Sequence, residues 1–151
     1  MKLNVSKIAA AYQVLGNASY EKMADDDKIK VWKIARELRP IAIKFEEDRV
    51  DAQRKLIPDA EFHANLQKAR QYESMLKEGR TDLPMTTEEY QKFAVEFDKN
   101  MELMTAALKE FADKEVEVNI KPLTEEAFSK LMASNNWTLK QVDALEFIIE
   151  Q

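Results

Sequence analysis

The sequence has no cysteine, only two glycines and only one histidine among 151 residues. Glycine supplies the tight turns of phosphate-binding loops and nucleophile elbows, so the isolated Gly16 and Gly79 exclude both kinds of site. The lone His63 has no second imidazole to share a metal, and it lies outside any H-E-x-x-H motif. We therefore expect no enzyme activity, no catalytic residue, no cofactor and no metal. The absence of cysteine fits a reducing cytoplasm.

Long hydrophobic runs are also missing. No segment approaches the roughly 18 consecutive apolar residues of a membrane-spanning helix, and the first residues lack the apolar region of a secretory signal. We expect no membrane association. Nothing in the sequence indicates a small-molecule substrate.

Charge is plentiful but uneven. The net charge of −5 argues against general binding to nucleic acids. Residues 1–58 hold 12 basic and 9 acidic side chains, whereas residues 59–151 hold 11 and 19. This asymmetry is typical of solvated helix faces. It is also what a complementary contact would need, within the molecule or between copies.

Two long amphipathic stretches, residues 25–57 and 86–114, dominate the pattern. Their apolar residues recur at 3–4 spacing, which indicates helices packed lengthwise. The first stripe is Val31, Ile34, Leu38, Ile41, Phe45 and Ala52, and the second is Tyr90, Phe93, Phe97, Met101, Met104, Leu108 and Phe111. We expect the stripes to face each other as an antiparallel pair within one molecule, with a helix over 60–77 beside them. Pro40 predicts a kink or a helix restart near 36–40.

Local signals set the helix ends. Asp59 is placed as an N-cap, and Thr86 with Glu89 and Thr138 with Gln141 have capping-box spacing. Gly16 and Gly79 each follow a helical stripe, where a terminating glycine belongs.

At residue 116 the period changes from 3.6 to two. Val116, Val118 and Ile120 alternate with polar residues, which predicts a short β element over 116–120. A lone strand is unstable, so it needs a partner. Residues 2–5 are the best one within the chain, and a second copy or another protein is the alternative. These three residues are our candidate interaction edge.

Residues 124–149 predict two short helices that form a C-terminal helical hairpin. A DNA-reading helix-turn-helix would carry basic or amide residues on its second helix. Residues 138–150 instead have Lys140 against Asp143, Glu146 and Glu150. A structural hairpin is the better interpretation, and a small nucleic-acid-binding regulator that uses 124–150 is the alternative function.

The order of these features resembles a family. An aromatic-rich helix leads into Glu115-Val116-Glu117-Val118 and then Pro122, and two short helices follow, the second introduced by Trp137-Thr138. A short start at Leu3-Asn4-Val5 and a long charged helix come before them. This order is similar to small phage- and prophage-encoded proteins of unknown function that are found near virion structural genes. The resemblance implies a phage protein in tail or head–tail assembly and no particular functional residue.

The sequence thus predicts a mainly α single domain over residues 1–151, with a long antiparallel helical hairpin, a small β element and a C-terminal helical hairpin. We expect a non-enzymatic protein that acts through a protein partner or self-association. The expected location is the cytoplasm of a bacterial host, or the virion itself.

Overall fold

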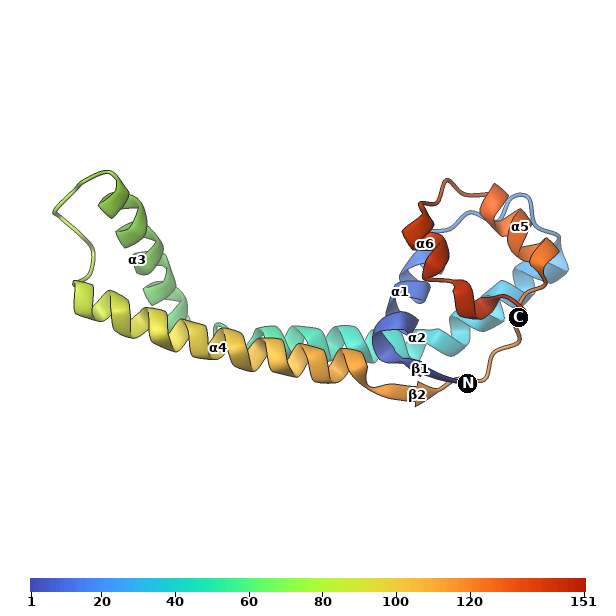
Figure 1. The fold of residues 1–151 in the computed structure, drawn as a ribbon, viewed down its shortest axis with the longest axis horizontal. Coiled ribbons are helices and arrows are strands. Elements are labelled where there is room, and N and C mark those ends of the chain that lie inside the picture. The colour runs from blue at the N-terminus through green and yellow to red at the C-terminus, as the bar shows by residue number, and fades with distance from the viewer. The chain divides into compact units, whose positions relative to one another are not determined.

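The computed structural model describes residues 1–151 and is mainly α-helical with one two-stranded sheet. This confirms the predicted fold class. Figure 1 labels the α-helices and strands. The elements run in the order β1 (Lys2–Asn4), α1 (Val5–Gly16), α2 (Asp25–Gln53), α3 (Ala60–Lys77), α4 (Thr87–Asp113), β2 (Glu115–Glu117), α5 (Glu125–Ala133), α6 (Leu139–Asp143) and the 3₁₀ helix η1 (Glu146–Ile148).

The chain divides into two compact units. Unit 1 comprises Met1–Glu47 and Phe111–Gln151, and unit 2 comprises Asp48–Glu110. Helices α2 and α4 each continue from one unit into the other. The predicted single domain, and the predicted packing of the two long stripes against each other, stay predictions.

The core of unit 1 joins both ends of the chain. Helix α1 contributes Ile8, Ala11 and Leu15, and the first stripe of α2 contributes Val31, Ile34 and Leu38. Residues from after β2 complete this core, namely Val118, Leu123, Ala127, Phe128, Leu131, Leu145, Phe147 and Ile148. Burial of apolar area stabilises a fold by about 25 cal/mol per Å², so this cluster of buried side chains stabilises unit 1.

The sheet of unit 1 pairs β1 with β2 in antiparallel register, with Leu3 opposite Val116. The ladder extends past both strands, because the Val5 N–H donates to the Lys114 carbonyl and the Val118 N–H donates to the Met1 carbonyl, each at 2.9 Å. The predicted partner of the 116–120 segment, residues 2–5, is therefore confirmed. The strand is shorter than predicted and ends at Glu117.

The chain after α5 differs from the predicted hairpin. The last helix was expected to run through Leu145 and Ile149, but α6 ends at Asp143. Leu145 then leaves the helical conformation, and Ile149 forms a parallel bridge with Leu123. Burial is the reason, because Leu145, Phe147 and Ile148 all reach the core, which one face of a regular helix cannot achieve.

Helix α2 continues through Pro40, so the predicted restart does not occur, and the alternative, a kink near 36–40, stays a prediction. Leu38 and Ala42 are buried on either side of the proline, and their packing offsets a cost of about 3 kcal/mol. Gly16 does not terminate α1 in a left-handed conformation, because it is the last helical residue and Asn17 follows as C-cap.

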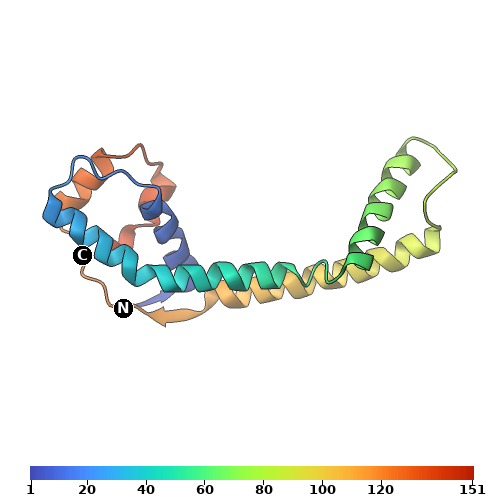
Figure 2. The same cartoon turned by 180° about the vertical axis from the view of Figure 1, so that it is seen from behind.

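Unit 2 contains a hairpin of α3 and α4, which Figure 2 shows from behind. Phe62, Leu66, Ala69 and Phe93 form its small core, with Tyr90 and Phe97 packed against it. Asp59 caps α3 by accepting from the Phe62 N–H at 2.7 Å, as predicted. Gly79 has φ +72°, and the Arg80 N–H donates to the Met75 carbonyl at 3.0 Å, so the glycine ends α3 as predicted.

Candidate interaction surfaces

The structure brings together no group of His, Asp or Glu side chains that could hold a metal ion. No charged or polar residue is buried, and no buried side-chain polar atom lacks a hydrogen-bond partner. The features that stand out are instead exposed apolar side chains and surface hollows.

The candidate edge at 116–120 lies against the core of unit 1. Val118 is buried, and the partly buried Val116 and Ile120 pack on the same cluster. Their side chains are therefore engaged within the chain. Only the backbone of the edge remains to receive a partner.

The ladder identifies that backbone. Residues in antiparallel strands alternate between groups that bond the partner strand and groups that point away from it. Since Val116 and Val118 face β1, the peptide groups of Glu115 and Glu117 point outward. Farther along this edge, the Asn119 N–H donates to a Glu37 carboxyl oxygen of α2 at 3.3 Å. The open edge is thus short and acidic, and charged edges disfavour strand pairing.

Helix α2 carries a second apolar stripe that sequence reasoning missed. Ile29, Trp32 and Ile43 are 51%, 52% and 50% exposed. Their spacing, with Pro40, places them on the face of α2 opposite its buried residues. The helical spacing of these residues was present in the sequence, but they lie beside the stronger stripe and were not identified as a second one. We call this the α2 outer face.

The α2 outer face is basic as well as apolar. Exposed Lys33, Arg36 and Arg39 lie among its apolar side chains. The guanidinium carbon of Arg36 is 4.7 Å from the centre of the Trp32 ring, which is a cation–π contact. Residues 28–44 hold six basic side chains and one glutamate, which leaves 17 basic and 27 acidic residues in the rest of the chain.

Helix α4 has an exposed face of the opposite sign in unit 2. Val95 is 71% exposed and Leu103 is 52% exposed. The exposed charged residues around Val95 at helical spacing are Glu88, Asp98 and Glu102 together with Lys92 and Lys99, so this face has a net charge of −1. We call this the α4 outer face.

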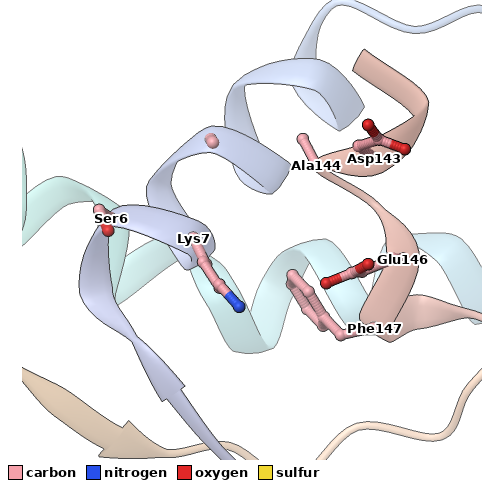
Figure 3. A pocket seen from close by; sticks show the side chains of 7 residues that line it. Ser6, Lys7, Asp143, Ala144, Glu146 and Phe147 are labelled. Atoms are coloured by element: carbon pink, nitrogen blue, oxygen red, sulfur yellow. The ribbon is translucent and has the colours of Figure 1, made fainter. Parts of the chain in front are cut away.

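Three hollows mark the surface. One of about 200 Å³ lies in unit 1 between α1 and the C-terminal segment, where the Lys7 and Glu146 side chains extend into it (Figure 3). It is smaller than the roughly 300–1,000 Å³ of small-molecule sites. A second of about 420 Å³ lies in unit 2 between α3 and α4, over Leu66 and Phe93. The third, of about 430 Å³, is in unit 1 beside Trp137.

Comparisons with known proteins give no family for this chain. No protein-family model matches it, and neither the curated proteins nor the solved structures provided a match. None of its helices combines the length and apolar character that crossing a membrane requires.

Proposed function

We propose that this is a non-enzymatic protein that self-associates, with the α2 outer face of one copy bound to the α4 outer face of the next. We further propose that it is of phage or prophage origin and acts in the assembly of a virion, in the host cytoplasm or as part of the particle. The resemblance described above supports that origin. The exposed stripe on α2 supports the mode of action.

One observation carries the proposal. Three large apolar side chains, each about half exposed, line one helix face together with three cations. Interface centres are enriched in Trp and Arg, and the exposed Trp32–Arg36 pair has this composition. An apolar helix face with no partner in its own unit is what a docking helix presents.

Charge favours a second copy as the partner. Each copy has a net charge of −5, so any attraction to the basic face is local and comes from the acidic residues that are in excess outside 28–44. On the α4 outer face, Glu88, Asp98 and Glu102 lie beside the exposed Val95 and outnumber the two lysines there, so this face offers both acidic and apolar groups to the α2 outer face. A contact between two different faces is heterologous and continues into rings or filaments. Such growth suits a component of an assembling particle.

Sedimentation velocity over a range of protein concentrations tests the proposal. We expect association at low salt that weakens as the Debye length falls to about 3 Å near 1 M salt. Trp32→Glu should abolish association, and so should Val95→Glu on the opposite face. Leu139→Glu is the matched control, since Leu139 is 76% exposed but lies on neither face.

A chain that stays monomeric at every concentration would overturn self-association. Equal association of Trp32→Glu and the wild type would assign the contact to another surface.

The basic run favours one alternative function, a small nucleic-acid-binding regulator. The predicted reading element at 124–150 gives it little support, because α6 has only five residues and Lys140 is its one cation. The α2 outer face is the better candidate for phosphate contacts. A mobility shift at low salt that disappears in Lys33→Glu/Arg36→Glu would favour this function, because phosphate contacts release counterions.

A further inference from the structure

The third hollow, of about 430 Å³, lies in unit 1 where the end of α1 meets the turn between α5 and α6. Amide side chains dominate its lining. The chain has 14 Asn and Gln residues, and five of them line this hollow: Gln13, Asn17, Asn135, Asn136 and Gln141. None of the lining residues is charged, although 34% of the chain is.

One of these amides fixes the walls. The Asn135 Oδ1 accepts from the Ser19 N–H at 2.7 Å, and its Nδ2 donates to the carbonyls of Ser19 and Leu131 at 2.8 and 2.9 Å. Both of its N–H groups are therefore engaged within the chain. Asn135 holds the α5–α6 turn against the loop that follows α1, so the hollow is formed before any ligand arrives.

The other amides keep free hydrogen-bonding groups. The side chains of Gln13 and Asn136 have no partner within the chain. Asn17 uses only Nδ2, which donates to the Gln13 carbonyl at 3.0 Å. Gln141 uses only Oε1, which accepts from the Thr138 N–H at 2.9 Å. Donors and acceptors are thus both available at the rim.

Trp137 supplies an apolar wall. It is partly buried and packs on the core of unit 1, and it also lines the hollow. An aromatic side chain held in this way offers a large, rigid surface at little cost in conformational entropy.

We infer that this hollow binds a neutral carbohydrate. A sugar hydroxyl both donates and accepts hydrogen bonds, as a primary amide does, and the C–H face of a pyranose ring is apolar like the indole. Charged ligands are disfavoured because no counter-charge lines the hollow. A nucleotide would bring a phosphate that meets no cation there. The volume is within the roughly 300–1,000 Å³ of small-molecule sites. This inference does not depend on the proposed self-association.

Fluorescence and NMR titrations of the full chain test this inference. In Trp32→Phe, Trp137 is the only indole, so its emission reports on the hollow alone. The probes are glucose, galactose and N-acetylglucosamine, with the free bases uracil and adenine as flat, uncharged comparisons that carry no sugar. We expect one of the sugars to give a saturable emission change with a dissociation constant on the order of 1 mM. The side-chain amide signals of Gln13 and Asn136 should shift along the same curve.

The double variant Gln13→Ala/Asn136→Ala should weaken sugar binding at least tenfold. Both positions are exposed, so the fold should persist, which far-UV circular dichroism checks. Gln67→Ala, an exposed amide on α3, is the matched control and should bind as the parent does.

Three results would overturn the inference. The first is no saturable change with any of the three sugars at tens of millimolar. The second is equal binding by the double variant. The third is an equal response to uracil and adenine, which would indicate stacking on Trp137 without sugar recognition.

Discussion

The side chain of Asn135 binds the backbone of Ser19 through both of its polar atoms, across 116 positions of sequence. The amide group acts as a neighbouring strand would, because it bonds both the N–H and the carbonyl of one loop residue. It closes unit 1 at the point where the loop after α1 meets the end of α5. The same contact shapes the amide-lined hollow.

Replacing Asn135 by Ala should therefore destabilise unit 1. The variant leaves two part-buried backbone groups of Ser19 without their partner, which costs about 1–3 kcal/mol. Urea unfolding followed by circular dichroism measures the loss. Asn136→Ala is the matched control, since Asn136 has no partner within the chain, and it should change the stability by no more than about 0.5 kcal/mol. Equal stability of the two variants would show that the Ser19 contact contributes little.

The two glycines should respond in opposite directions to alanine. Gly79 has φ +72°, so a Cβ there costs about 1–2 kcal/mol. Gly16 is helical, and a Cβ built on it meets nothing within 4 Å, so alanine should stabilise by up to about 1 kcal/mol. Thermal unfolding of both variants measures the difference. A stabilised Gly79→Ala would contradict the left-handed end of α3.

Replacing leucine by alanine should cost much more folding stability at a core position than at an exposed position. Leu38 is 0% exposed in the core of unit 1, so Leu38→Ala should cost about 2–5 kcal/mol. Leu139 is 76% exposed, and Leu139→Ala should fall within about 0.5 kcal/mol of the wild type. Denaturant unfolding compares the two. A small cost for Leu38→Ala would mean that α2 is not anchored where the structure places it.

Local chemistry explains which features of the fold could be predicted. Asp59, Gly79 and the Thr138–Gln141 pair act within a few residues of their own position, and the structure confirms each role. The pairing of residues 2–5 with β2 was also predicted. A lone strand is unstable, and residues 2–5 were the best candidate partner strand within the chain.

Nonlocal contacts explain the features that could not be predicted. The bridge between Leu123 and Ile149 ends the last helix early, and no local signal marks it. Burial around Leu38 keeps α2 helical through Pro40 against the local preference. The amide-lined hollow draws on three segments that only the fold brings together. By contrast, the spacing of Ile29, Trp32 and Ile43 was readable in the sequence. The sequence shows their spacing but not that these apolar side chains are exposed to solvent, and only the structure shows the exposure.

An exposed ion pair beyond α3 offers a direct test by titration. The Arg80 guanidinium donates two hydrogen bonds to the Asp82 carboxyl, at 3.1 and 2.6 Å. This contact lowers the pKa of Asp82 below its ordinary value. An NMR titration should place the Asp82 midpoint below those of ordinary aspartates, and Arg80→Ala should raise it. The stabilisation from this pair is present above the ordinary pKa of about 3.9 and is lost as pH falls through the lowered one. An unchanged midpoint in Arg80→Ala would contradict the contact.

Tyr90 should show the opposite dependence on pH. Its hydroxyl, on α4, donates a hydrogen bond to the Glu73 carboxyl of α3, and this bond raises the pKa of Tyr90 above its ordinary value. The bond stabilises the α3–α4 hairpin below the ordinary pKa of about 10 and is lost as pH rises through the raised one. In a spectrophotometric titration, subtracting the absorbance of Tyr90→Phe from that of the wild type should leave the ionisation of Tyr90 alone. This ionisation should occur at a higher pH than that of an ordinary tyrosine.

Glu73→Gln is the informative second variant for Tyr90. It removes the charge that holds the phenol neutral, so the Tyr90 ionisation should move back toward its ordinary pH. In this variant, the free energy of unfolding should no longer contain the part that the Tyr90–Glu73 hydrogen bond contributes and that is lost at alkaline pH. Tyr20 provides an internal control, because burial raises its pKa and its hydroxyl donates to the Leu15 carbonyl at 2.6 Å in unit 1. Its ionisation should not respond to Glu73→Gln. If the Tyr90 ionisation also failed to respond, the two helices would not be joined through this hydrogen bond.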